Sequence, residues 1–186
     1  MNQKSKIFSS GKNKIKGQIW VETVIYTLIA FVLIGAVLAF VKPKIEEIQD
    51  KTIIEQSIEV LNNLESKISE IRQGGTGNKR EIELKVKKGV LKIDGVNDKL
   101  TFEIESKDLY SQPGEEVQYG NIIIYTEEKG NTNIVNLTRD YSESYDLKYN
   151  GADELKLINP ASIPYKIFIS NSGKTDSITI INFEIA

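Results

Sequence analysis

Glu22 is the residue of this chain whose placement most clearly requires a chemical explanation. It is the single charged side chain between Ile19 and Val41, a run that is otherwise apolar or uncharged. An acidic group costs about 2.5 to 3.5 kcal/mol at the centre of a membrane helix, and less near its ends, so such a group normally has a partner. Glu22 therefore predicts a specific partner, or else a carboxyl group that is protonated or lies near lipid headgroups.

Most other catalytic chemistry is excluded by composition. The chain contains no Cys and no His, which removes disulfides, thiol nucleophiles and Ser-His-Asp triads. Adjacent acids such as Glu115 and Glu116 point apart on a strand or helix and form no acid/base couple. The alternation from Asp140 to Asp146 has the oxygen spacing of a calcium loop, but it lacks the sixth-position Gly and the closing Glu. We therefore expect no catalytic residue, cofactor or metal site, and we expect that the protein is not an enzyme.

The apolar run has the length of a membrane-crossing helix. Ile19 to Val41 comprises 23 residues, roughly 34 Å at about 1.5 Å per residue, and a bilayer core is about 30 Å thick. Five lysines and no acid precede it within the first 17 residues, whereas only Lys42 and Lys44 follow closely. Because the more basic flank stays in the cytoplasm, we expect the chain after Val41 to lie outside the cell.

The charge of the remaining chain argues against one class of partner. The chain has 24 basic and 26 acidic residues, so without the five leader lysines 19 basic and 26 acidic residues remain, a net charge of −7. Nucleic-acid-binding domains are basic because they neutralise phosphates. We therefore expect no nucleic-acid partner.

Three processing outcomes are compatible with this N-terminal segment. A conventional signal peptide would be cut after Ala39, although the apolar run exceeds the roughly 7 to 15 residues of such peptides. An uncut segment would act as a simple signal anchor. The third outcome is a cut on the cytoplasmic side between Gly17 and Gln18, and the residues at that junction favour it.

The junction Lys16-Gly17-Gln18 is followed by an apolar helix with Glu22 at the fifth position counted from Gln18. This arrangement resembles the class III signal peptide of archaeal type IV pilins and their relatives, the archaellins. The resemblance covers about residues 12–45. It implies that a prepilin peptidase cuts after Gly17 and that the apolar helix survives as the assembly element of a filament.

The resemblance also implies a partner for Glu22. Cleavage creates a new α-amine on Gln18, four residues before Glu22, a spacing at which groups on a helix are neighbours. In a filament core, Glu22 would face the Gln18 amine of a neighbouring subunit. The implied partners are other copies of this chain in a helical homopolymer, the prepilin peptidase, an assembly ATPase and a polytopic membrane platform. Before assembly the chain would lie in the membrane.

The helical pattern continues beyond the membrane-length run. Apolar residues recur at steps of three and four from Ile54 to Ile71, with charged residues between them, which predicts an amphipathic helix. Pro43 should kink or restart the helix, and Gly35 marks a second weak point or a close approach of another helix. The stripe is covered either by the chain's own domain or by a coiled-coil partner.

From Arg80 onward the period changes to two. Alternating runs at 81–87 and 100–105 predict strands with one solvated face. Further strands are expected at 90–94, 121–126, 133–138, 155–158, 163–170 and 177–185. Seven or eight short strands without helices between them favour an antiparallel β-sandwich. The last strand ends at the end of the given sequence, so it could also be completed by an adjacent subunit.

Two surface features complete the expectations for this domain. Asn136 begins the single N-glycosylation sequon of the chain, Asn136-Leu137-Thr138, although the sequon falls within a predicted strand and its side chain can face inward. Tyr141, Tyr145 and Tyr149 form either an exposed aromatic patch or the partly buried rim of the sandwich.

The sequence therefore predicts an α+β protein: a long N-terminal hydrophobic helix followed by an antiparallel β-sandwich. The expected parts are a basic leader (1–17), a long helix (18–72, apolar over 18–41 and amphipathic over 42–72), a linker (73–79) and an extracellular β-domain (80–186). We expect a pilin-like structural subunit of a surface filament with a role in adhesion. The alternatives are an uncleaved single-pass membrane protein that displays a binding domain, an archaellin or a minor pilin.

Overall fold

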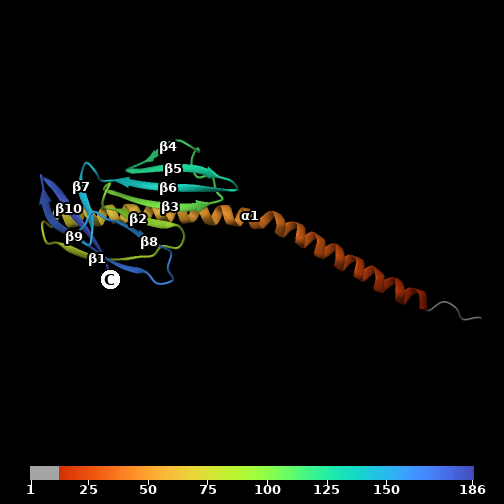
Figure 1. Cartoon of the computed structure of the whole chain (residues 1–186). Coiled ribbons are helices and arrows are strands. Elements are labelled where there is room, and N and C mark those ends of the chain that lie inside the picture. The colour runs from red at the N-terminus through yellow and green to blue at the C-terminus, as the bar shows by residue number, and fades with distance from the viewer. Residues whose placement is uncertain (1–12) are drawn as a thin grey trace, which may run out of the picture. The chain divides into compact units, whose positions relative to one another are not determined.

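The computed structural model describes the backbone of residues 13–186 and the side chains of residues 20–186. By its internal contacts the chain divides into two compact units, one up to Ile45 and one from Glu46 to Ala186. The helix α1 (Asn13–Gln73) contributes to both units, and all ten strands belong to the second. Figure 1 shows the helix and the strands.

The helix α1 is longer than the sequence pattern indicates. It begins at Asn13, five residues before the predicted start at Gln18, because a single Gly costs only about 1 kcal/mol in a helix interior. Pro43 lies inside it, so the helix does not restart there. After Gln73 the chain turns through Gly75 and Gly77, both with positive φ, a conformation that glycine adopts without a steric penalty.

The second half of α1 is covered by the chain's own domain. Its apolar side chains belong to one hydrophobic core together with the strands. They are Ile54, Ile58, Leu61, Leu64, Ile68 and Ile71, each at most 6% exposed. The predicted amphipathic stripe is therefore confirmed, and the coiled-coil alternative for it is wrong.

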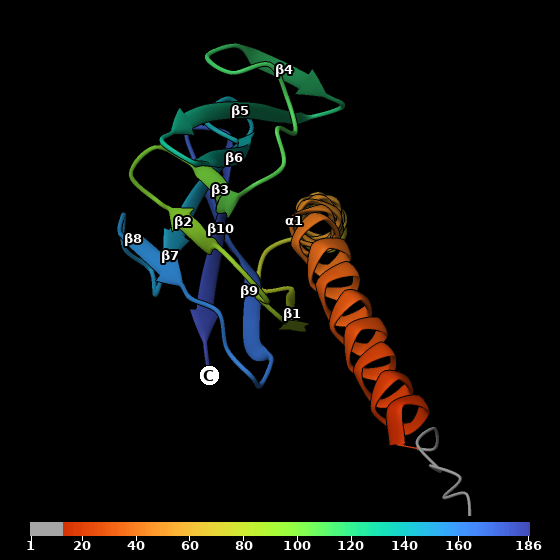
Figure 2. The same cartoon turned by 90° about the vertical axis from the view of Figure 1, so that its right-hand side faces the viewer.

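A six-stranded antiparallel sheet forms the larger part of the domain, in the order β4-β5-β6-β3-β2-β8. Its strands are β2 (Val90–Asp94), β3 (Lys99–Ser106), β4 (Glu116–Tyr119), β5 (Ile122–Lys129), β6 (Thr132–Asp140) and β8 (Leu155–Ile158). Alternate residues such as Leu100, Phe102 and Ile104 are buried on one face. Figure 2 shows these strands from β4 to β8.

A four-stranded sheet has the order β1-β9-β10-β7. Its strands are β1 (Lys79–Leu84), β7 (Tyr145–Tyr149), β9 (Tyr165–Thr175) and β10 (Ile178–Ile185). The β10–β7 pair is parallel, so the expectation of a purely antiparallel domain is wrong, whereas every other pairing between strands is antiparallel. Because β10 lies between β9 and β7, the chain's own strands complete it on both sides, which removes the expectation of a donated last strand.

The tyrosine series is core rather than surface. Tyr141 is 1% exposed and Tyr145 is 6% exposed, and their ring centroids lie 5.6 Å apart. Burial raises the pKa of the Tyr141 hydroxyl well above its ordinary value. The guanidinium of Arg139 lies over the Tyr141 ring and its Nε donates to Glu65 of α1 at 3.0 Å. Tyr141 and Tyr145 therefore form neither the exposed aromatic patch nor the partly buried rim that the sequence suggested. Tyr149 is half-buried.

Candidate functional site

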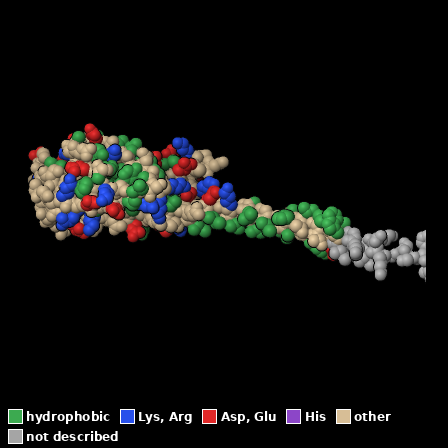
Figure 3. Space-filling view, turned by 90° about the horizontal axis from the view of Figure 1, so that it is seen from below, with side chains coloured by type: hydrophobic (Ala, Val, Ile, Leu, Met, Phe, Trp, Pro, Cys, Tyr) green, Lys and Arg blue, Asp and Glu red, His purple; other side chains and the backbone are tan. Residues whose placement is uncertain are grey.

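The candidate site is the apolar stretch of α1 from Trp20 to Val41. All of its side chains are exposed within the single chain, including Trp20 (71%), Val32 (70%) and Phe40 (79%). By length and composition it is the one stretch of the described helix that could cross a membrane. Figure 3 shows hydrophobic side chains along this stretch and charged ones on the domain surface. It is therefore a candidate membrane anchor or signal.

The distribution of the apolar side chains around the helix limits what can cover them. Successive helical residues are separated by about 100°, and the uninterrupted run from Val32 to Ile34 therefore points in different directions. An amphipathic stripe can be covered from one side, but a helix that is apolar all round must be surrounded. Lipid or several neighbouring helices meet this requirement.

Among the side chains from Trp20 onward, Glu22 has one hydrogen-bond partner, which sequence analysis did not identify. The Tyr26 hydroxyl donates to Glu22 Oε1 at 3.1 Å, one helical turn further along. The i,i+4 spacing was the available signal for this pair. A single neutral donor leaves the carboxylate with further acceptor capacity, since an ionised carboxylate has about four lone-pair sites. The site can therefore still accept a cation or another donor.

The predicted processing residues are not tested by this geometry. Lys16, Gly17 and Gln18 lie in the first turns of α1, but their side chains are outside the described residues, as is the leader up to residue 12. The Gln18 amine as a partner of Glu22 stays a prediction.

Gly35 offers a surface for close helix packing. A Cβ placed on it would meet no atom of the chain within 4 Å. Small residues let two helix backbones approach closely in membranes. The space beside Gly35 is thus open within the described chain, and the close approach of another helix stays a prediction.

Asp50 marks where α1 becomes part of the domain. It is 6% exposed and is the first buried residue of the helix in the described chain. One carboxylate oxygen accepts the backbone N–H of Lys107 at 2.8 Å, and the other accepts from Lys88 Nζ. Lys107 Nζ in turn pairs with Glu46. These contacts fasten two loops to the helix, and sequence analysis missed them because they join residues far apart in the chain.

Asn136 lies on the face of the six-stranded sheet opposite the core. It is half-buried, between the buried Val135 and Leu137 on β6. Its neighbours across the sheet are Glu103 of β3 and Tyr125 of β5. The side chain therefore does not face the core, but it lies within an inner strand rather than a loop. Glycosylation of Asn136 stays a prediction.

The calcium-like spacing at 140–146 belongs to a turn. Asp140 Oδ1 accepts hydrogen bonds from the backbone N–H and the hydroxyl of Ser142. Burial raises the pKa of Asp140, but the bonds from Ser142 and the charge of Lys99 outweigh it and hold the pKa below the ordinary value. Asp146 pairs with Lys148. Within residues 20–186 no three acidic side chains form a group that could hold a metal ion.

Comparison of the chain with protein-family models, with curated proteins and with solved structures finds no match. What the exposed helical stretch does is therefore inferred from its own residues.

Proposed function

We propose that this protein is a pilin-like structural subunit of a type IV pilus-like surface filament. The observation that carries the proposal is the exposure of the whole stretch from Trp20 to Val41, apolar on every side and interrupted by one carboxylate, Glu22. Burying apolar surface contributes about 25 cal/mol per Å². A helix exposed in this way is therefore stabilised by lipid before assembly and by other helices after it leaves the membrane.

Within this proposal the parts of the chain have separate roles. A prepilin peptidase cuts between Gly17 and Gln18 and releases the Gln18 amine. The apolar helix then packs among those of neighbouring subunits, and the domain from Glu46 onward, its two sheets packed as a β-sandwich, coats the filament outside the cell and serves adhesion. The resemblance of residues 12–45 to archaeal pilins supports this order of events, and it implies an assembly ATPase and a polytopic membrane platform as partners.

Glu22 provides the register of assembly in this mechanism. An unpaired carboxylate in an apolar environment is costly, and the Tyr26 hydroxyl satisfies only part of its acceptor capacity. The amine of a neighbour's Gln18 would supply the missing positive charge. Subunits that are out of register would leave both charges unpaired among apolar helices, so the pair selects one axial alignment.

The first experiment determines the N-terminus of the protein from the membrane and surface fractions of its host by mass spectrometry. The proposal expects a start at Gln18 and filaments in the sheared surface fraction. A start at Met1 without filaments would make the chain a single-pass anchor that displays its domain, and a start at Phe40 would make it a secreted domain.

A substitution series then tests Glu22 itself. Glu22→Ala should be inserted and processed but should form no filaments visible by electron microscopy. Tyr26→Phe is the matched control, because it removes the hydrogen bond within the chain and keeps the carboxylate. Normal filaments from Glu22→Ala would contradict the proposed pairing.

A further inference from the structure

The domain part of α1 is flanked by two grooves of different character. Its buried stripe faces the strands, which leaves a flank on each side of the stripe. Ile53, Gln56 and Val60 line one flank, and Lys51 and Glu55 line the other. At 3.6 residues per turn these two sets lie on different sides of the stripe centred on Ile54, Leu61 and Ile68.

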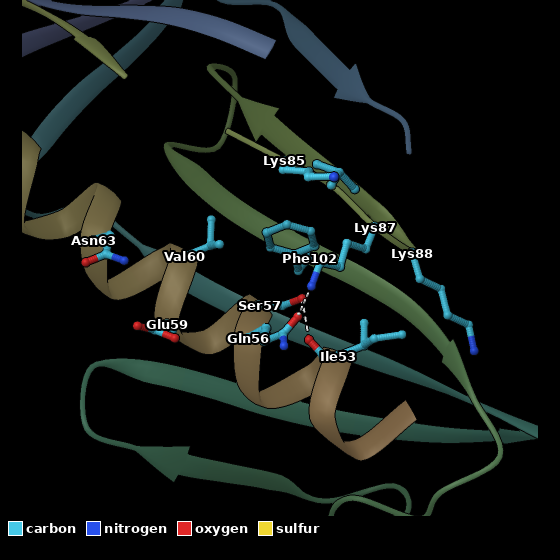
Figure 4. A pocket seen from close by; sticks show the side chains of 11 residues that line it. Ile53, Gln56, Ser57, Glu59, Val60, Asn63, Lys85, Lys87, Lys88 and Phe102 are labelled. Carbon is cyan, nitrogen blue, oxygen red and sulfur yellow. Dashed lines mark hydrogen bonds between the residues drawn. The ribbon is translucent and has the colours of Figure 1, made fainter. Parts of the chain in front are cut away.

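The first groove, of about 270 Å³, has an apolar floor and a basic rim. Figure 4 shows Phe102 between α1 and the segment that carries Lys85, Lys87 and Lys88. Lys87 Nζ donates to the neutral amide oxygen of Gln56 at 3.0 Å, so no carboxylate offsets its charge at that contact. Glu59 is the one acidic residue of the lining, and Lys88 is paired with Asp50, so Lys85 and Lys87 carry the positive charge of the rim. We call this surface the basic groove.

The second groove, of about 440 Å³, lies between α1 and the edge strand β4. Val117 and Tyr119 stand opposite Ile124 and Ile122 of β5, so they share the face of the sheet that is buried elsewhere. Yet Val117 is 40% exposed and Tyr119 is 59% exposed. The core face of the sheet therefore continues onto β4, where its apolar side chains stay uncovered.

The rim of this second groove is acidic. Glu55 and Asp108 line it beside the exposed Leu109, and Lys51 is its one basic residue. Glu115 precedes β4 and Glu116 is its first residue; both are exposed, and Glu116 lies on the face of the sheet opposite Val117 and Tyr119. We call this surface the acidic groove. The two grooves thus combine apolar floors with rims of opposite charge.

We propose that the acidic groove of one copy of this chain binds the basic groove of the next copy. The proposal rests on the proposed function and names the contact between domains within the filament. Two unlike surfaces on one chain make a head-to-tail contact that leaves one free groove at each end, so it can repeat without closing. Opposite rim charges align the copies, and Tyr119 and Leu109 supply the aromatic and apolar contacts typical of an interface centre.

Cysteine cross-linking in the full-length protein tests this contact, and the chain has no Cys of its own. Lys85→Cys reports the basic groove and Tyr119→Cys the acidic groove; both side chains are exposed. After oxidation of surface fractions, the double variant should give a ladder of covalent multimers. Co-expressed single variants should give dimers only, and each single variant alone should give none. Lys129→Cys with Lys174→Cys, at two hairpins outside both grooves, is the matched control.

Charge reversal supplies the second readout. Here the cross-link is formed between Val60→Cys and Tyr119→Cys, so that Lys85 and Lys87 of the basic groove can both be changed. Lys85→Glu with Lys87→Glu should lower its yield by roughly tenfold or more, since like charges at an interface are costly. Adding Glu55→Lys and Asp108→Lys to the same chain should restore the yield.

The outcomes separate the two proposals. Filaments that form with Gln18 at the N-terminus but give no ladder, or that cross-link through one single variant alone, overturn the groove contact and leave the proposed function standing. A chain that keeps Met1, forms no filaments and gives no ladder overturns both.

Discussion

Two stretches of α1 show how one helix can contain opposite solutions to the burial of apolar side chains. Between Ile54 and Ile71 the apolar residues lie on one stripe, and Ile54, Ile68 and Ile71 are fully buried by the chain's own sheets. Between Trp20 and Val41 apolar residues occupy every side, and all are exposed.

The stretches differ in how their apolar residues are spaced around the helix as well as in how many they contain. Spacings of three and four leave charged residues such as Glu55 and Glu59 to face water, so one sheet is enough to cover the stripe. A helix without a polar face cannot be covered from one side. The comparison teaches that the second stretch is completed by lipid or by several other helices, whereas the first is completed within the monomer.

The largest expected effect comes from truncating one apolar residue in each stretch. Ile68→Ala leaves a cavity in the core and should lower the free energy of unfolding of the domain by about 2 to 5 kcal/mol. Val32→Ala, at a 70% exposed position, should leave the domain unchanged. Urea unfolding of the full chain in detergent, followed by near-ultraviolet circular dichroism of the buried Tyr141 and Tyr145, measures both.

In filament assembly the order of the two variants should be reversed, with the larger effect at Val32. Val32→Ala should weaken filaments while its domain remains native, and Trp20, the single Trp of the chain, reports the surroundings of the apolar stretch by fluorescence. Equal losses of domain stability in the two variants would remove the distinction between the stretches.

A smaller effect is expected at Asp50, where the buried part of the helix begins. Asp50→Ala removes the acceptor of the Lys107 N–H and the partner of Lys88. A hydrogen bond to a charged group contributes about 1.5 to 3 kcal/mol, so the domain should be destabilised by about that amount or less, because the bond is only part-buried, and the Lys107 amide should exchange with solvent faster. Asp50→Asn is the control, because its amide oxygen can still accept the Lys107 N–H. Unchanged exchange at Lys107 in the Ala variant would show that Asp50 does not fasten this loop.

Local patterns were enough to predict much of the domain. Strands at 90–94 and 155–158 have the predicted bounds, and the stripe from Ile54 to Ile71 is buried as expected. These features depend on the alternation of polar and apolar neighbours, which the sequence displays directly.

The features that were missed depend on distant residues. β4 is an exception: it pairs with the neighbouring β5 across the two residues Gly120 and Asn121, and its four residues are too few to display a clear alternation. β7 includes Tyr145 and Leu147 and pairs in parallel with β10, which lies much later in the chain. Likewise Val86 is buried although it follows the end of β1. Local periodicity does not predict which distant strands pair with each other.

The smallest effect concerns the pH dependence of the stability of the domain. Burial raises the pKa of Asp98 above its ordinary value, against the hydrogen bond from the Leu147 N–H at 2.7 Å. For Asp140 the bonds from Ser142 and the charge of Lys99 outweigh burial and lower the pKa. The two carboxyl groups should therefore give stability contributions of opposite sign.

The signs follow from proton linkage. With its folded pKa raised, Asp98 binds protons more readily in the folded state, so its contribution to stability falls as the pH rises from its unfolded pKa through its folded pKa. With its folded pKa lowered, Asp140 contributes stability above its unfolded pKa of about 3.9 and loses it as the pH falls through its folded pKa.

Asp98→Asn should thus stabilise the domain slightly at neutral pH, also because Asn tolerates the positive φ of this position. Asp140→Asn should destabilise it slightly there and become neutral in acid. Urea unfolding at neutral pH and near pH 3 compares them, and changes of the same sign at neutral pH would contradict the assignment of these two environments.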